Sequence, residues 1–216
     1  MSYFRYIDNG DGPTKLFVGG IHGNEGKTSI KFLKKLKKSY FSNGQIYIYN
    51  FDKSQYISTI NKKYYESEIG LKVLDLIKTL KPDFYTELHC YNIKNFDKLT
   101  SIDRINQTGV PPLIDLGNYV LVSSVSPLIR IDYFDMFDVC KTLEFPCLDK
   151  LTPAIKEKYG FDEKKAIDTY MDMLKLIAIA PTRKYFEEKI YEDYTKQANL
   201  AIKFAKFIFG EGFPPY

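Results

Sequence analysis

The chain has 216 residues, of which 44% are hydrophobic and 27% charged, a balance typical of one globular domain with a sizeable core. The formal net charge of +4 is mild, and the lysines are spread over helical patterns, which argues against a nucleic-acid surface. No apolar segment is long enough to span a bilayer, and the N-terminus lacks the layout of a signal peptide. We therefore expect a cytoplasmic protein with no nucleic-acid or membrane partner.

The first half of the chain predicts strands that alternate with helices, because apolar residues recur first at strand spacing and then at helical spacing. The expected elements are an edge strand over residues 3–8, a buried strand from 16 to 18, a helix over 27–40, a strand over 45–51, a loop over 52–67, a helix over 69–80 and a strand over 84–89. Together, the strand from 16 to 18, the helix over 27–40 and the strand over 45–51 predict a βαβ unit.

The second half becomes helical toward its end. The expected elements are a long loop over residues 90–118, a strand over 119–123, a strand over 138–145, a short helix after 152, a helix over 166–177 and an amphipathic helix over 183–209. One α/β domain over residues 1–216 is predicted, with a mixed, mostly parallel sheet flanked by helices and a helical portion over 151–216. The last helix is interpreted as core or as a homo-oligomer contact.

The three cysteines are Cys90, Cys140 and Cys147, an odd number without CxxC spacing. This pattern predicts reduced, mostly buried thiols. It favours neither a disulfide framework nor a thiolate metal site.

The chain has only two histidines, and each lies at the end of an apolar run. His22 follows Gly19-Gly20 and precedes Glu25 by three residues, and His89 ends the next predicted strand. The ends of neighbouring parallel strands meet at one sheet edge, where open α/β sheets bind ligands. His22, Glu25 and His89 would then form a His₂Glu set, which is typical of catalytic zinc sites.

A structural alternative exists for each residue of this set. His22 would stand at a helix start, Glu25 would be a solvated first-turn carboxylate, and His89 would be a satisfied core histidine. The coincidence of both histidines with strand ends and with a glycine-bounded HxxE favours the metal site.

These residues resemble a known family. Residues 19–25, which read Gly-Gly-Ile-His-Gly-Asn-Glu, are similar to the zinc motif of the metallocarboxypeptidase superfamily, especially its aspartoacylase and succinylglutamate desuccinylase branch. Residues 86–89 resemble its second motif, and residues 141–146 resemble its later strand with the catalytic glutamate. Within the superfamily, the chain looks most like a small uncharacterised group from methanogenic archaea.

The resemblance implies a zinc carboxypeptidase-like (phosphorylase/hydrolase-like) fold and a zinc-dependent reaction. His22, Glu25 and His89 would bind Zn²⁺, and Glu144 would be the general base. This chemistry is coherent, because zinc lowers the pKa of a water and a nearby carboxylate takes its proton during attack on an amide. Without this resemblance, Glu144 would be interpreted as a carboxylate at a strand end that is paired with a lysine.

The substrate-binding region departs from that branch, in which arginines hold a substrate carboxylate. Asn61 matches an asparagine of the branch, and Lys62 stands where it has arginine, which keeps the charge but loses the bidentate fork. Arg104 and Arg130 are the other candidates for an anion clamp, against an ordinary surface or ion-paired role.

The hypothesis from sequence is a zinc-dependent hydrolase of an amide bond, either a small peptidase or an N-acyl amino acid deacylase. A serine nucleophile is not favoured, because residues 123–126 lack the G-x-S-x-G elbow and no third histidine is available as base. The alternative is a non-catalytic metal-binding or regulatory protein that retains the fold. A nucleic-acid-associated protein is a third reading, motivated only by the basic balance.

Overall fold

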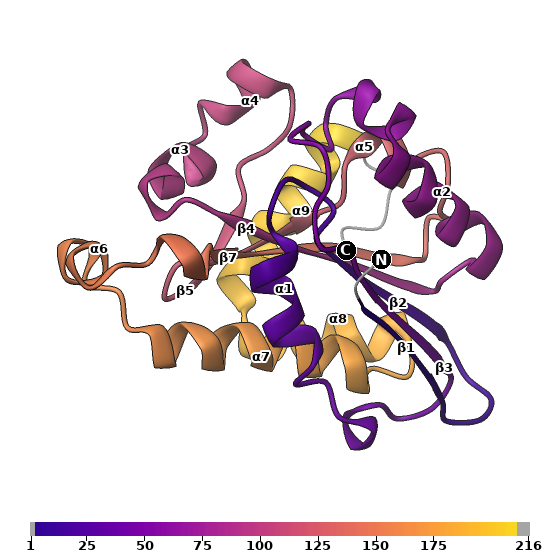
Figure 1. Cartoon of the computed structure of the whole chain (residues 1–216). Helices are drawn as coiled ribbons and strands as arrows, with labels where there is room; N and C mark the ends of the chain where they lie inside the picture. The colour runs from indigo at the N-terminus through magenta and orange to yellow at the C-terminus, as the bar shows by residue number, and fades with distance from the viewer. Residues whose placement is uncertain (1–2, 211–216) are drawn as a thin grey trace.

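A seven-stranded mixed sheet forms the centre of the molecule (Figure 1), with the strand order β1-β3-β2-β4-β7-β6-β5. The computed structural model describes residues 3–210, so residues 1–2 and 211–216 of the predicted domain lie outside the described part. The strands are β1 (Tyr3–Asp8), β2 (Thr14–Gly19), β3 (Gln45–Asn50), β4 (Phe84–Tyr91), β5 (Ile114–Gly117), β6 (Val120–Ser124) and β7 (Val139–Pro146).

The pairing confirms the mixed α/β class and corrects the expected balance of strand directions. The pairs β2–β3, β2–β4 and β4–β7 are parallel, whereas β1–β3, β5–β6 and β6–β7 are antiparallel. A mostly parallel sheet is therefore wrong. The antiparallel pairs lie at the two sides of the sheet, where β1 forms one edge and the tight β5–β6 hairpin forms the other.

Helices cover both faces of this sheet (Figure 1). They are α1 (Gly26–Leu33), α2 (Glu68–Leu80), α3 (Phe96–Thr100), α4 (Arg104–Thr108), α5 (Pro127–Arg130), α6 (Pro153–Tyr159), α7 (Glu163–Ile179), α8 (Arg183–Asp193) and α9 (Thr195–Phe209). Single 3-10 turns lie at Lys38–Tyr40, Lys62–Glu66, Ile93–Asn95 and Leu148–Lys150. Among the residues from 3 to 210, no helix has the length and apolar character that a membrane span needs.

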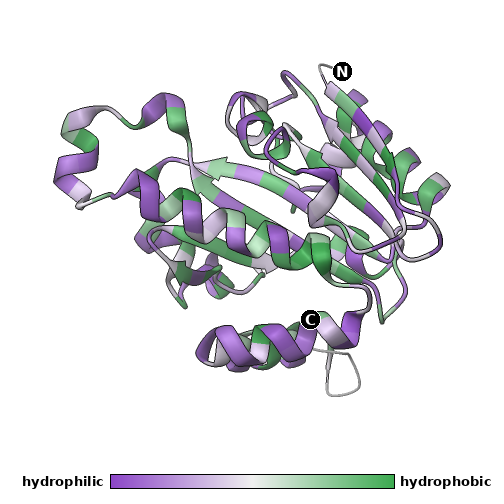
Figure 2. Ribbon diagram, turned by 90° about the horizontal axis from the view of Figure 1, so that it is seen from below, coloured by the Kyte–Doolittle hydropathy of each residue, from purple (hydrophilic) through white to green (hydrophobic). Residues whose placement is uncertain are grey.

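The buried apolar side chains form one large cluster on each face of the sheet. One joins the sheet to α1, α7, α8 and the start of α9, and the other joins it to α2 and α5. In Figure 2, the helix that leads to the C-terminus carries both hydrophobic and hydrophilic residues along its length, as expected of an amphipathic helix. The four central strands β3, β2, β4 and β7, which are parallel to one another, are thus covered on both faces, as is usual for such strands.

The predicted βαβ unit is confirmed, with β2, α1 and β3 in that order and β2 parallel to β3. The turn between β2 and α1 needs glycine because the backbone there is crowded. Gly20 has a φ of +72°, and a Cβ at Gly20 or Gly26 would lie 1.9 or 2.0 Å from the carbonyl oxygen of Phe51. These glycines let the turn pack directly against the end of β3.

A buried lysine ties β2 to the end of α7. The Lys15 side chain is fully buried, and its Nζ donates to the carbonyl oxygens of Ile177, Ala178 and Ala180 at 2.9, 2.7 and 2.5 Å. These carbonyls lie at the C-terminal end of the helix, where a cation is favoured. Lys15 therefore satisfies carbonyl groups that the helix itself leaves unpaired.

Three predicted elements differ from the structure. The expected helix over residues 27–40 ends at Leu33 and is followed by a separate 3-10 turn at Lys38–Tyr40. The expected loop over residues 90–118 contains α3, α4 and β5, and the expected helix over 183–209 is two helices that are separated at Tyr194. Tyr194 has φ −137° and ψ 44°, which is not helical. The apolar pattern continues across this break, so periodicity alone does not reveal it.

The predicted reduced state of all three cysteines is also wrong. Cys90 and Cys147 form a disulfide across 57 residues of sequence, with a Cα–Cα distance of 4.9 Å, whereas Cys140 is free and buried. The two partners lie beside each other because β4 and β7 are neighbours and the N–H of Cys147 donates to the carbonyl of Tyr91. Sequence spacing cannot show that proximity.

Candidate functional site

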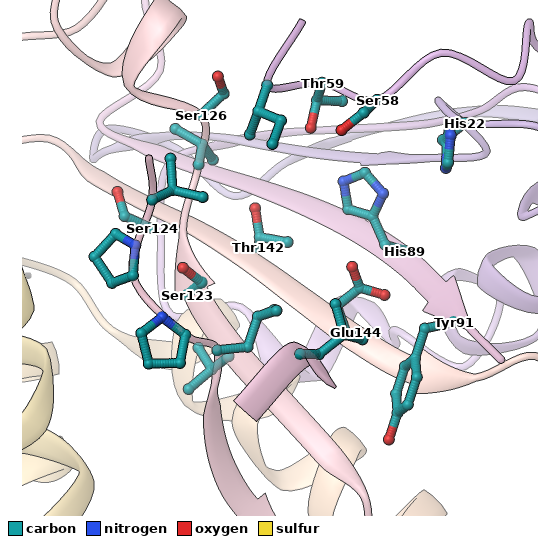
Figure 3. Close-up of a pocket in the computed structure, with 18 of the residues that line it drawn as sticks. His22, Ser58, Thr59, His89, Tyr91, Ser123, Ser124, Ser126, Thr142 and Glu144 are labelled. Carbon is teal, nitrogen blue, oxygen red and sulfur yellow. The ribbon is translucent and has the colours of Figure 1, made fainter. Parts of the chain in front are cut away.

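The four residues predicted to carry the chemistry lie together beyond the carboxyl ends of the central strands, and Figure 3 labels three of them, His22, His89 and Glu144. His22 lies in the turn after β2, and Glu25 directly precedes α1. His89 of β4 is paired with Glu144 of β7 in the parallel register, so both side chains point to the same face. All four line one cavity.

The two imidazoles face the same buried carboxylate. His22 Nδ1 is 3.3 Å from Glu25 Oε1, and His89 Nδ1 is 3.0 Å from Glu25 Oε2. The side chains of Glu25 and His89 are 7% and 6% exposed, whereas that of His22 is 22% exposed. Three side chains that could bind a metal ion therefore converge, and the Nδ1 atoms of both histidines face the carboxylate oxygens of Glu25.

The other ring nitrogen of His89 is held by a second carboxylate. Glu87 is 1% exposed, and its Oε2 lies 3.2 Å from His89 Nε2. The hydroxyls of Tyr85 and Thr142 donate to the same carboxylate at 2.9 and 3.3 Å. When the N–H of His89 Nε2 donates to Glu87, the lone pair of Nδ1 is free to bind a metal ion. Carboxylates orient metal-binding histidines in this way.

Charge pairing shifts the pKa of both central groups. Burial opposes protonation of His89, but the adjacent carboxylates, Glu25 first, outweigh it and raise its pKa well above the usual range. Burial likewise disfavours the ionised form of Glu25, but the positive charge of His89 and the hydrogen bonds from His22 and His89 together outweigh burial and lower the pKa of Glu25. Without a metal ion, the two side chains therefore form a buried ion pair.

Glu144 has the opposite electrostatic character. Burial raises the pKa of its carboxyl to about 7, against a smaller lowering by His89. Its Oε2 is inaccessible to solvent and has no hydrogen-bond partner among residues 3–210. A carboxyl that titrates near neutral pH and lines a cavity has the properties of a general acid–base group.

The donor set fits zinc in residue type, and its spacing is compatible. Tetrahedral zinc with ligand bonds of about 2.0–2.1 Å places its donors about 3.3 Å apart, close to the 3.0 and 3.3 Å found between the imidazoles and Glu25. In the described part of the chain, however, no group of three or more His, Cys, Asp or Glu side chains is already arranged as a metal site. Binding would require the Glu25 ion pairs to open.

The cavity that contains these residues has a volume of about 360 Å³, within the range of small-molecule sites. Figure 3 shows hydroxyl groups of Ser58, Thr59, Ser123, Ser124 and Ser126 around it, with His22, His89 and Glu144 toward one end.

Tyr56 lines the end of this cavity at which His22 lies. Its ring packs against that of His22 with a centroid distance of 4.4 Å, although its side chain is 81% exposed. Tyr56 also lies so close to Gly23 that a Cβ there would be 2.5 Å from the ring. Glycine at position 23 is therefore required by this packing as well as by its φ of +57°.

The predicted substrate residues divide into two groups. Asn61 and Lys62 are exposed and do not line the cavity, and the Asn61 side chain instead accepts the N–H of Lys63 at the start of a 3-10 turn. Arg104 and Arg130 both line the cavity. Two of the four are thus brought to the site.

The two arginines differ in their bonding. The Arg130 guanidinium donates to the carbonyls of Asp135, Met136 and Asp138, so it holds the loop before β7. Arg104 donates to the carbonyl of Pro111. Burial lowers the pKa of Arg104, and the negative charge of Glu144 opposes that shift. Arg104 is therefore the arginine whose charge acts on Glu144.

Three features of the site were not predicted from sequence. Two of them line the cavity, namely the serines of β6 and the segment after it, and the apolar side chains of α9. The third is Glu87, which does not line the cavity but contacts His89 from behind. Glu87 and His89 are two residues apart in one strand and so share a face, a signal that could have identified Glu87. Nothing in the sequence pairs α9 with the site.

The chain was then compared with known proteins. Residues 10–210 match the family described as an uncharacterised protein conserved in archaea, DUF2119. The chain belongs to this family. It is also 38% identical over 211 residues to the uncharacterised protein MJ0501 of Methanocaldococcus jannaschii, covering 95% of both chains. No solved structure matches the chain.

This family assignment corrects the resemblance inferred from sequence. The family that matches is DUF2119, and no metallocarboxypeptidase family matches. The assignment to that superfamily and its aspartoacylase and succinylglutamate desuccinylase branch was wrong, although an uncharacterised archaeal family is correct. The resemblance rested on short motifs around two histidines and one glutamate, and such short patterns recur in unrelated proteins.

Proposed function

We propose that this member of DUF2119 is a zinc-dependent hydrolase of an amide bond, a small peptidase or an N-acyl amino acid deacylase. The observation that carries the proposal is the convergence of His22 Nδ1 and His89 Nδ1 on Glu25, with Glu144 paired to His89 in the sheet. The proposal needs only these strand ends and no likeness to a known hydrolase fold.

The roles of the side chains follow from their surroundings. Zinc, when bound, would act as a Lewis acid toward an amide carbonyl and lower the pKa of a water. His22, Glu25 and His89 would hold it, and Glu87 would keep His89 in the tautomer that leaves Nδ1 free. Glu144, with a pKa of about 7, can take a proton near neutral pH and return it to the leaving amine.

Arg104 supplies the positive charge that a substrate carboxylate would need. Its guanidinium carries five N–H donors, and the hydrogen bond from Nη1 to Pro111 uses one of them. A substrate with a carboxylate near its scissile amide is consistent with this placement. Peptides and N-acyl amino acids both have that chemistry.

Metal analysis of the purified protein tests the proposal. About one zinc per chain is expected from a His₂Glu site, and His22→Ala and His89→Ala should lose it. Glu144→Gln should keep the zinc and lose hydrolysis of peptides and N-acyl amino acids by about 10²-fold or more. Full stability with no bound metal, in protein supplied with zinc during expression, would refute the metal site. Undiminished turnover in Glu144→Gln would exclude Glu144 from the reaction.

A second candidate is a non-catalytic metal-binding or regulatory protein. The observation in its favour is that Glu25 already contacts the ring nitrogens of both histidines and forms a buried ion pair with His89, so the cluster is stable without a metal ion or a substrate. This candidate predicts no hydrolysis of any peptide or N-acyl amino acid by a protein that holds stoichiometric zinc.

A further inference from the structure

The cavity continues beyond the catalytic residues into a part with apolar walls, which we call the apolar arm. Two segments far apart in the sequence form it, one between α3 and β5 and the other in α9. Its lining includes Leu99, Val110, Pro111, Phe204, Ala205 and Ile208. In Figure 3, helical ribbon in the yellow colour of the C-terminal segment lies on the side of the cavity away from His22 and His89.

The two halves of α9 have different surroundings. Ala198, in the first half, is 1% exposed and belongs to the core beneath the sheet. In the second half, positions 201, 204, 205 and 208 line the cavity, and this spacing places them on one face of the helix. Phe207 lies off that face and is 59% exposed. The second half of α9 is thus a wall of the cavity.

The lining face of α9 carries two small residues one turn apart, Ala201 and Ala205. Alanine side chains leave space where larger residues would fill the cavity, whereas Phe204 and Ile208 beside them add apolar surface. All four are only partly buried, so their apolar surface faces the cavity. Apolar surface that is concave and unfilled is characteristic of ligand-binding grooves.

We infer that the apolar arm binds an apolar group of the substrate, and that Ala201 and Ala205 determine how large a group fits. The group is either an acyl chain or an apolar amino acid side chain next to the scissile amide. The arm shares one cavity with His22, Glu25, His89 and Glu144, and a volume of about 360 Å³ suits a small molecule and not a protein segment. The inference rests on the proposed amide hydrolysis only for the identity of the reacting bond.

Binding of two ligand series to the purified full-length protein tests this inference without requiring turnover. One series is N-acyl glycines from acetyl to octanoyl, and the other is N-acetyl glycine, alanine, norvaline and leucine. Burial of each added methylene should strengthen binding by about fourfold until the arm is full. The series that responds identifies the source of the apolar group.

Variants of α9 locate the effect. Ala205→Leu should weaken binding of the longest responding ligand by tenfold or more and leave N-acetyl glycine unchanged, whereas Ala154→Leu, at an exposed position in α6, should change neither. Phe204→Asp should remove the dependence on length, and Phe207→Asp should keep it. Equal affinity across both series, or the same length dependence in Ala205→Leu as in the parent, would overturn the inference.

Zinc content and hydrolysis, measured on the same samples, separate this inference from the proposed function. Length-dependent binding in a protein that holds no zinc and hydrolyses nothing would refute the proposed function alone. Zinc-dependent hydrolysis that is indifferent to ligand length would refute the apolar arm alone.

Discussion

Replacing Glu87 by glutamine should weaken metal binding without unfolding the protein. The substitution preserves shape, and an amide oxygen in the place of Oε1 can still accept from the Tyr85 hydroxyl at 2.9 Å. The amide nitrogen would then take the place of Oε2, which Thr142 and His89 both contact, and the Thr142 hydroxyl would accept from it. The amide nitrogen, however, is a donor and would face His89 Nε2. The imidazole would then accept at Nε2 and carry its proton on Nδ1, the atom that faces Glu25.

The magnitude follows from that change of tautomer. Removing an outer partner of a metal-binding histidine typically costs 10–100-fold in metal affinity, which corresponds to about 1.4–2.8 kcal/mol. The free energy of unfolding of the metal-free protein should fall by about 1.5–3 kcal/mol, because one hydrogen bond to a buried charged group is lost. We expect zinc affinity and stability to fall together, and only the loss of zinc affinity is specific to a metal site.

Competition with a chromophoric chelator measures the zinc affinity, and urea unfolding of metal-free samples measures the stability. Glu68→Gln is a matched control, because the Glu68 side chain is 76% exposed and pairs only with Lys72 on the surface of α2. Zinc affinity in Glu87→Gln equal to that of the parent, in a folded protein, would contradict the orienting role of Glu87.

Three further predictions concern the pH profile, the core and the disulfide. Because Glu144 is active as a base only when ionised, its pKa of about 7 in the metal-free protein is an upper bound once a zinc cation is nearby, and kcat/KM should rise with pH to a plateau reached by about pH 8; a profile that is flat between pH 4 and 8 would contradict this role. Lys15→Met should lower the free energy of unfolding by about 2–4 kcal/mol, because three carbonyl oxygens at the end of α7 lose their donor; urea unfolding measures the loss, and a change below about 0.5 kcal/mol would show that these bonds contribute little. Reduction of Cys90–Cys147, which closes a loop across 57 residues, should destabilise the protein by up to about 4 kcal/mol; equal thermal unfolding with and without a dithiol reductant would indicate that the bond is absent in solution.

The elements near the candidate site were predictable because their signals are local. The apolar run before Gly19, the helical spacing after it and the β-rich residues from 45 identify β2, α1 and β3, and these agree with the structure. The strand that carries His89 was predicted from the turn at residues 81–83 and from the mainly apolar run that follows it. The convergence of His22, Glu25 and His89 followed from placing the ends of parallel strands together, whereas Glu144 was selected only through the resemblance to the metallocarboxypeptidase superfamily.

The errors arose where the outcome depends on contacts between distant segments. Antiparallel pairing of β5, β6 and β7 depends on which edges meet, and strand patterns do not encode direction. The disulfide depends on β4 and β7 being neighbours, and the break at Tyr194 lies inside a continuous amphipathic pattern.

The substrate residues show the same limit. Asn61 and Lys62 were selected by their place in a motif, but the fold leaves both exposed and away from the cavity. Of the two arginines, only the packing distinguishes Arg130, which holds a loop, from Arg104, whose charge acts on Glu144. A side chain's role depends on the partners that the fold gives it, and these are not local in sequence.

The sequence by itself determined which residue types could perform chemistry, because the chain has only two histidines and both follow apolar runs. Tertiary structure alone decided that Glu87 holds His89, that Arg104 and not Lys62 lies at the cavity, and that α9 forms its far wall. The physical reason is that strand ends are positioned by local hydrophobic patterns, whereas the cavity is enclosed by segments separated by more than one hundred residues. Their meeting depends on how the whole chain packs.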